Sequence, residues 1–382
     1  MFKLTNDAGR SRLKDLLLVF CLLSAAGSAN AMMTCALQPG SVAQTVTGSL
    51  ANISVTAGRD LPLGALLANQ AVTEFSNVSV RCSGGADRNV TYVQSFLTNG
   101  LALSPWQPSD EGAGKVWLTN VPGVGVAFRN GTGNNSGGGT YLPNTWVKTE
   151  IGNPFVLNAR LGVVQAFFYK IGNISPGSVS TANFPRFAMT IGGVRLWTFN
   201  FSGTMSFVSQ TCTTPNQLVI LGNRPQSDFV GINTGSPFVD FAIELKNCPA
   251  FFGQSRAVAQ HYVTSVGNPG ATFGSTESIS QTSNTIRFQL TPPAGNIHSP
   301  GILTLGAPTG GATNATGIGI EIRQRSAPAP IAFNTWLDAL SLSNVNANST
   351  QTIPLSARYV QTAAQVTPGQ ANSSVEFILE YK

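Results

Sequence analysis

The chain has 382 residues, of which only 10% are charged, and it contains 40 glycines and 22 prolines. This composition favours short strands joined by turns over helices, and no stretch after the first 31 residues sustains an amphipathic helical period. The formal net charge of +6 is scattered without a basic run after those residues, which argues against nucleic-acid binding. A chain of this length exceeds one ordinary core, so two domains are expected.

Residues 1–31 have the composition of a secretory signal peptide. Basic residues precede the apolar run 16–26, and small residues with the triplet 29–31 follow it. The run is shorter than the ~20 residues of a membrane helix. A lipoprotein cysteine at Cys21 is disfavoured, because the bulky Phe20 precedes it and the apolar region continues past it. We therefore expect cleavage after the triplet and export.

Four cysteines remain after this leader: Cys35, Cys82, Cys212 and Cys248. An even number in an exported chain argues for disulfides, and the spacing favours the pairs 35–82 and 212–248 over the other two connectivities. A zinc site is disfavoured because the chain has no CxxC spacing and no histidine before His261. We expect neither a metal nor a cofactor.

The two halves of the mature chain differ in charge. Residues 32–208 contain ten Lys and Arg against six Asp and Glu, whereas residues 209–382 contain eight of each. Each half holds one of the expected disulfides, and residues 207–211 lie between them. We place the domain boundary there, giving domains at 32–208 and 209–382.

The second half contains a series of segments with the alternating pattern of β-strands. The last one places Val375, Phe377, Leu379 and Tyr381 on one face. The others lie at 217–222, 239–245, 286–290, 317–324 and 353–361. This number and spacing of strands predict an immunoglobulin-like sandwich.

These segments resemble the pilin domain of chaperone–usher fimbriae. The resemblance covers all of 209–382. It is carried by Cys212 and Cys248, by GIGIEI (317–322), by ARYVQT (357–362) with VTPG (366–369), and by a terminal strand with Tyr381 penultimate. Gly369 stands where such pilins place a glycine, fourteenth from the C-terminus.

The resemblance implies an immunoglobulin-like sandwich that lacks its last strand. The open groove would be filled by β-augmentation, first by a strand of a periplasmic chaperone and later by the next fimbrial subunit, with assembly at an outer-membrane usher. The groove residues are then Gly369, Val375, Phe377, Leu379, Tyr381 and Lys382, whose terminal carboxylate would anchor in the chaperone. Alternatively, the terminal strand simply pairs inside a complete sandwich.

The first half points to a position at the fimbrial tip. Cleavage after residue 31 leaves three residues ahead of Cys35, too few for a donated strand. Residues 32–208 resemble the receptor-binding β-sandwich of type 1 and type 3 tip adhesins through the early cysteine and the segments 77–82, 123–128 and 167–179. The resemblance implies a two-domain tip adhesin on the bacterial surface.

Residues 104–146 combine aromatic rings with planar polar groups, as sugar sites do. The candidate receptor residues are Trp106, Asp110, Arg129, Asn130, Asn134, Asn135, Tyr141 and Trp146. The alternative is that the tryptophans belong to the core, with Trp117 the strongest case. The receptor would be a host glycan or a matrix protein.

The sequence contains few features that would indicate an enzyme. The histidines, His261 and His298, are flanked by ordinary loop or strand sequence, and no GxSxG, HExxH or kinase motif occurs. We predict a non-enzymatic fimbrial tip adhesin. The alternatives are a structural tip or initiator subunit without a receptor, and a secreted enzyme whose site the sequence does not reveal.

Overall fold

The computed structural model describes residues 33–85, 88–109, 114–131, 140–262 and 278–382, with the backbone alone at 73–76, 161, 254–262 and 278–279. The predicted signal peptide lies outside the described residues. The described part contains twenty-four strands and two short 3-10 helices, η1 (Thr181–Asn183) and η2 (Gln226–Asp228). None of its helices is long and apolar enough to cross a membrane. The expected all-β class is confirmed.

The N-terminal body is a sandwich whose larger sheet is built on two long antiparallel strands, β4 (Leu66–Ser83) and β10 (Phe155–Lys170). Beyond β10 follow β7 (Val124–Gly131) and β6 (Val116–Leu118), while β1 (Thr34–Leu37) pairs with β4 and β8 (Thr140–Tyr141) pairs with β7. Alternate residues of β7 and β10 point to opposite faces, so one face of each strand enters the core.

The second layer has the strand order β2 (Gln44–Ser49), β13 (Val194–Ser202), β12 (Arg186–Ile191), β5 (Asn89–Thr98) and β9 (Asn144–Thr149). A small sheet of β11 (Gly177–Ser180), β14 (Thr204–Val208) and β3 (Ser54–Thr56) extends the body. The two layers enclose one core rich in phenylalanine. Phe128 of the first layer packs edge-on against Phe187 of the second, with ring centroids 5.0 Å apart.

The first disulfide joins Cys35 to Cys82, with an S–S distance of 2.02 Å. The antiparallel register of β1 and β4 places the two cysteines directly opposite each other. The predicted pairing is confirmed, and it fastens the first strand to the centre of the larger sheet.

The C-terminal body is a second sandwich. One sheet has the order β15 (Val239–Cys248), β23 (Ser349–Gln361), β21 (Ile318–Gln324), β20 (Ile302–Leu303) and β19 (Ile297–Ser299), and the other β22 (Leu337–Leu342), β18 (Asn284–Thr291) and β24 (Glu376–Tyr381). The core between them contains Leu245, Phe251 and Phe288. Five of the six predicted strands are present.

The predicted strand at 217–222 is not formed, and Cys212 also lies outside the strands. Cys212 is bonded to Cys248, as predicted, with an S–S distance of 2.09 Å. Residues 217–222 keep the alternation of buried and exposed side chains. Among the described residues they have no neighbouring strand to pair with, so the ladder of backbone hydrogen bonds that defines a strand does not form. The sequence pattern correctly predicted which face of this segment is buried, but it did not show that a neighbouring strand is absent beside it in the described part of the chain.

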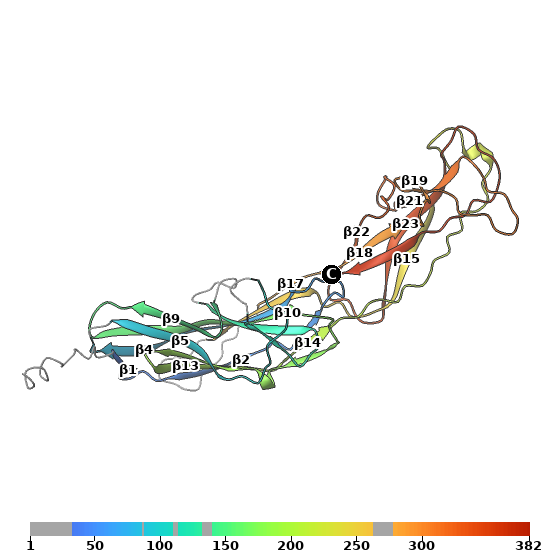
Figure 1. The fold of residues 1–382 in the computed structure, drawn as a ribbon. Coiled ribbons are helices and arrows are strands. Elements are labelled where there is room, and N and C mark those ends of the chain that lie inside the picture. Colours follow the sequence, from blue (N-terminus) through green and yellow to red (C-terminus); the bar gives the residue numbers. More distant parts are fainter. Residues whose placement is uncertain (1–32, 86–87, 110–113, 132–139, 263–277) are drawn as a thin grey trace, which may run out of the picture.

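The two bodies are joined by the chain at 208–212 and also by strand pairing between them. The hairpin of β16 (Gln254–Tyr262) and β17 (Ser278–Thr282) follows Cys248 in sequence but adds to the edge of the N-terminal sheet. There β16 runs parallel to β4, with Arg256 opposite Ala68 and Tyr262 opposite Glu74. Figure 1 shows two elongated bodies, with the C-terminus of the chain at their junction. The boundary at 208 and 209 stays a prediction.

Candidate functional site

The terminal strand β24 has one paired edge and one edge that faces away from its sheet. On the paired edge, Lys382 and Thr285 exchange two backbone hydrogen bonds of 2.7 and 2.8 Å. In an antiparallel ladder such pairs alternate with non-bonded pairs. The N–H and C=O groups of Phe377, Leu379 and Tyr381 therefore point away from β18.

The extended residues 214–221 form a wall opposite this edge. Leu218 and Ile220 are 88% and 74% exposed, while Leu221 is 7% exposed and Val219 packs on the core. The segment thus has an inner and an outer face like a strand, although it has no ladder. The side chains of its inner face, Val219 and Leu221, point toward the cavity beside β24.

Between this wall and β24 lies a cavity of about 400 Å³. Val219, Leu221, Phe377 and Val375 line it together with core residues of both sheets: Phe241, Ile243, Leu290, Leu303, Ile320, Ile322, Leu355 and Ala357. A second hollow of about 250 Å³ follows along β24. We call the two together the β24 groove. It is largely apolar and runs along the unpaired edge.

Four of the predicted groove residues, Val375, Phe377, Leu379 and Tyr381, line the β24 groove. Gly369 does not: it lines a separate pocket of about 350 Å³. A Cβ atom at Gly369 would lie 2.3 Å from the backbone of Asn314 and Ala315, so glycine allows a close approach there. The side chain of Lys382 forms an ion pair of 3.1 Å with Glu380.

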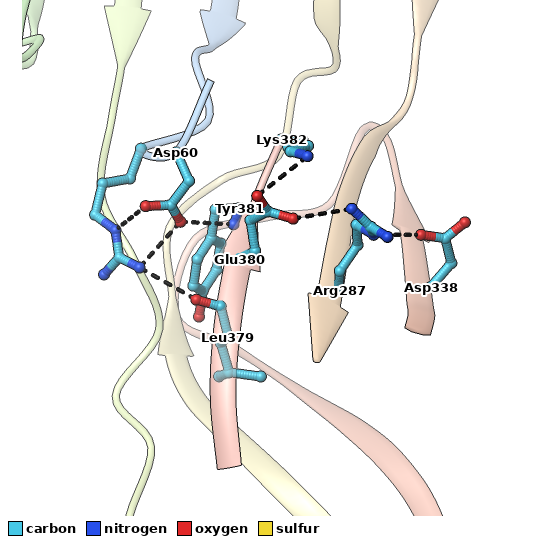
Figure 2. A network of polar contacts seen from close by, with 8 residues as sticks. Asp60, Arg287, Asp338, Leu379, Glu380, Tyr381 and Lys382 are labelled. Atoms are coloured by element: carbon cyan, nitrogen blue, oxygen red, sulfur yellow. Dashed lines mark hydrogen bonds and ion pairs between the residues drawn. The ribbon is translucent and has the colours of Figure 1, made fainter. Parts of the chain in front are cut away.

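The second hollow is bounded by Arg59 of the N-terminal body. Figure 2 shows Asp60 at the edge of β24, beside Tyr381. Asp60 accepts a hydrogen bond of 2.9 Å from the Tyr381 N–H and forms an ion pair of 2.9 Å with Arg59. On the other side of β24, Glu380 binds Arg287 at 3.2 Å. Polar contacts therefore hold both sides of the strand end.

The protonation of this junction follows from its contacts. Burial alone would raise the pKa of Asp60, but hydrogen bonds from Arg59 and from the Tyr381 N–H outweigh it and the pKa lies below its usual value. The hydrogen bond to Asp60 raises the pKa of Arg59. Burial raises the pKa of Tyr381, whose hydroxyl accepts a 3.3 Å hydrogen bond from the Cys212 N–H. At neutral pH the Arg59–Asp60 pair is therefore charged.

The predicted receptor residues fall into separate groups. Arg129 stacks on the rings of Tyr141 and Phe167, at 3.9 and 4.9 Å from their centroids, and donates a hydrogen bond to the Tyr141 hydroxyl. Tyr169 lies 3.5 Å from that hydroxyl and packs against Trp106, with ring centroids 5.7 Å apart. We call these five residues the aromatic cluster.

Asn130 follows Arg129 on β7 and therefore points to the opposite face of the sheet. There it is buried and accepts a hydrogen bond from Gln94 of the second layer. Trp146 is half-buried on β9 and stacks on Tyr92 at 5.2 Å. The Tyr92 hydroxyl donates to Glu150 at 2.6 Å. Asn130 thus lies on the face opposite the aromatic cluster, and Trp146 lies on a strand of the second layer.

Asp110, Asn134 and Asn135 lie outside the described residues. Trp117, the strongest core candidate, is buried in the N-terminal core. The prediction of a single receptor site from residues 104–146 thus stays a prediction, of which three residues, Trp106, Arg129 and Tyr141, come together.

Comparisons with known proteins show similarities in the C-terminal half and along most of the chain. Residues 199–382 match the family model described as fimbrial protein. The fimbria adhesin protein of Klebsiella pneumoniae is 24% identical over 331 residues, which cover 86% of this chain and 88% of that protein. The fimbrial subunit type 1 of Salmonella typhimurium is 28% identical over 190 residues, 48% of this chain and 82% of that subunit.

Residues 199–382 are similar to this family, and we call the C-terminal body, which lies within them, the fimbrial domain. The resemblance to fimbrial adhesins drawn from the sequence is confirmed by this match and by the adhesin that aligns along most of the chain. The expected place of the protein, an exported component of the fimbria, is confirmed by the same relatives.

Two solved structures of adhesins have a low similarity to the chain. The receptor binding domain of the plasmid-born adhesin MrkD1P of Klebsiella pneumoniae is 18% identical, with a TM-score of 0.33, and covers 48% of this chain and 99% of its own. The CupB6 tip adhesin from Pseudomonas aeruginosa is 13% identical, also with a TM-score of 0.33, and covers 91% of this chain and 94% of its own.

Sequence reasoning missed the residues that the N-terminal body contributes to the fimbrial domain. Arg59 and Asp60 lie in a short polar turn with no motif, so no local signal marks their contact with β24. Phe167 and Tyr169 of the aromatic cluster had a signal, since they alternate on β10 opposite Ala127 and Gly125. Their place beside Arg129 depends on register, which the sequence alone does not fix.

Proposed function

We propose that the protein is a fimbrial tip adhesin. Residues 32–208 bind a receptor on a host or other surface, and residues 209–382 anchor them to the fimbria by accepting a strand. The observation that carries this proposal is the β24 groove, an apolar groove beside an unpaired strand edge in a domain of the fimbrial family. The alignment of most of the chain with a fimbria adhesin supports the receptor-binding role.

Anchoring follows from the physics of the open edge. The backbone groups of Phe377 pair with an added strand, and alternate apolar side chains of that strand fill the cavity beside Val219 and Leu221. Each buried CH₂ group contributes about 0.8 kcal/mol. A periplasmic chaperone supplies the first strand and the next subunit supplies the second, at an outer-membrane usher.

The groove is tested by a pair of variants on one segment. Leu221→Asp places a charge on the inner face and should abolish recovery of a complex with the periplasmic chaperone. Ile220→Asp places the same charge on the outer face, at a side chain that is 74% exposed and is not among those lining the groove, and should leave recovery unchanged. Equal recovery of both variants, or recovery after deletion of 372–382, contradicts strand capture in this groove.

For receptor binding, we propose the aromatic cluster as the first candidate site. Trp106 and Tyr169 offer ring faces, and Arg129 offers planar donors in a position fixed by stacking on Tyr141. Sugar rings bind such surfaces because their faces are apolar and their edges need hydrogen bonds. The ligand class is a glycan of a host surface or a matrix protein that carries apolar and polar groups together.

The receptor test is a screen of the mature protein on a glycan array with immobilised matrix proteins alongside. Trp106→Ala should weaken a saturable hit about tenfold or more, since removing a central aromatic group costs over ~1.4 kcal/mol. Trp336→Ala, in the fimbrial domain, is the matched control and should bind normally. If folded protein binds nothing, a structural tip or initiator subunit without a receptor becomes the better description.

A further inference from the structure

A turn of the N-terminal body occupies part of the unpaired edge of β24. The Asp60 N–H donates to the Tyr381 C=O at 3.0 Å, and the Tyr381 N–H donates to an Asp60 carboxylate oxygen at 2.9 Å. Arg59 donates to the Leu379 C=O at 3.2 Å. Three backbone groups at the C-terminal end of this edge are therefore already bonded within the chain; Figure 2 shows the bonds at the Tyr381 N–H and the Leu379 C=O.

The pattern around Tyr381 is that of strand pairing. In an antiparallel ladder, one residue gives its N–H and accepts at its C=O from a single residue of the neighbour. Asp60 does the same for Tyr381, with its carboxylate in place of a backbone carbonyl. The turn thus imitates one residue of an added strand.

The close approach depends on Gly58. A Cβ atom at this position would lie 2.4 Å from the Tyr381 C=O oxygen and 2.7 Å from the Lys382 Cα. Both are backbone atoms and cannot move aside as a flexible side chain could, so any larger residue forces the turn away from β24.

Hydrogen bonds from Lys170 and Asn284 also hold the turn and the residue before it in place. Lys170 is 5% exposed and its ammonium donates to the Arg59 C=O. Just before the turn, the buried Thr56 accepts a 2.8 Å hydrogen bond at its C=O from Asn284 of the fimbrial domain. These contacts fix the turn at the end of the β24 groove, where Arg59 lines the second hollow.

We propose that the Gly58–Asp60 turn is a strand stop. A strand that enters the β24 groove pairs alongside Phe377 and ends at Arg59, while the turn stays hydrogen-bonded to the backbone of Tyr381. A strand long enough to reach Tyr381 competes with the turn for the same backbone groups and separates the N-terminal body from the strand end. This inference rests on the proposed function of the groove as a strand acceptor.

The occupant is an extended segment with alternating apolar side chains. The lining of the groove is apolar along Val219, Leu221 and Phe377, whereas its end at Arg59 is charged. An apolar strand is therefore favoured along the groove and disfavoured past Arg59. The length of the strand, rather than its sequence, decides whether the turn stays bound.

The test uses the mature protein and two synthetic peptides of alternating Val and Thr. The short peptide spans the groove from Ser373 to Phe377, and the long one extends to Tyr381. Gly58→Ala removes the stop, and Asp60→Ala is a second variant that removes the acceptor for the Tyr381 N–H. Gly231→Ala is the control, because a Cβ atom there meets nothing within 4 Å.

The strand stop predicts that Gly58→Ala and Asp60→Ala tighten binding of the long peptide about tenfold, the equivalent of one or two hydrogen bonds that no longer compete. Binding of the short peptide stays unchanged, and Gly231→Ala changes neither. Amide exchange at Tyr381 should also rise in both variants. If both peptides respond equally to the variants, the stop is wrong although the groove accepts strands. If neither peptide binds any variant, the strand-acceptor function itself is wrong, and the inference fails with it.

Discussion

Asn284 is the residue whose loss should most clearly loosen the junction between the two bodies. It is 2% exposed, and its amide makes two hydrogen bonds: it donates to the Thr56 C=O at 2.8 Å and accepts from the Gly253 N–H at 3.1 Å. Asn284→Ala leaves both buried backbone groups without this partner. Each orphaned group costs about 1–3 kcal/mol, so we expect a loss of roughly 2–6 kcal/mol for the two.

The assay is equilibrium unfolding of the mature protein in guanidinium chloride, followed by tryptophan fluorescence. Exposed Asn346→Ala is the control and should stay within about 0.5 kcal/mol of the wild type. Because Asn284 and Asp60 both hold the junction, the effects of Asn284→Ala and Asp60→Ala should be less than additive. An Asn284→Ala effect no larger than the control, or full additivity, would refute this account of the junction.

Three further predictions concern the disulfide, the ion pair and the terminal tyrosine. Replacing both Cys35 and Cys82 by Ser should lower the free energy of unfolding by about 4 kcal/mol, because the bond closes a long loop; a calorimetric loss under ~1 kcal/mol contradicts this. Asp60 has a depressed folded pKa, so its contribution is complete above its unfolded pKa of about 4 and is lost as pH falls through the folded value. We expect the protection of backbone amides at the contact between the two bodies against hydrogen exchange, measured from pH 7 to 3, to fall only below about pH 4. Asp60→Asn should remove that fall, and a loss of protection already at pH 6 would point to another group. Tyr381→Phe removes the hydroxyl that accepts from the Cys212 N–H and should cost about 1 kcal/mol in thermal unfolding, whereas no change would mean that water replaces the bond.

The alternating segments of the second half could be predicted because burial of one face imposes a period of two. The terminal strand, found at Glu376–Tyr381, is the clearest case. The same reasoning wrongly predicted a strand at 217–222, because the pattern reports which face is buried and not whether a neighbouring strand is present. The disulfide pairs followed from spacing alone.

The contacts between the bodies could not be predicted from the sequence. The hairpin of β16 and β17 joins a sheet whose strand β4 lies about 190 residues earlier, and no local signal encodes such a pairing. The receptor residues show the same limit. Arg129 and Asn130 are adjacent in the sequence, yet the strand directs them to opposite faces, one to the aromatic cluster and one to the core.

In the proposed function, the N-terminal body binds a receptor while the fimbrial domain holds it on the fimbria. The most direct measurement is binding of the mature protein, with its groove filled by the short peptide, to a panel of glycans and matrix proteins. We predict saturable binding to a defined ligand, weakened by Trp106→Ala and unchanged by Trp336→Ala. Folded protein that binds no member of the panel, or a hit that both variants weaken equally, would contradict receptor binding by the aromatic cluster.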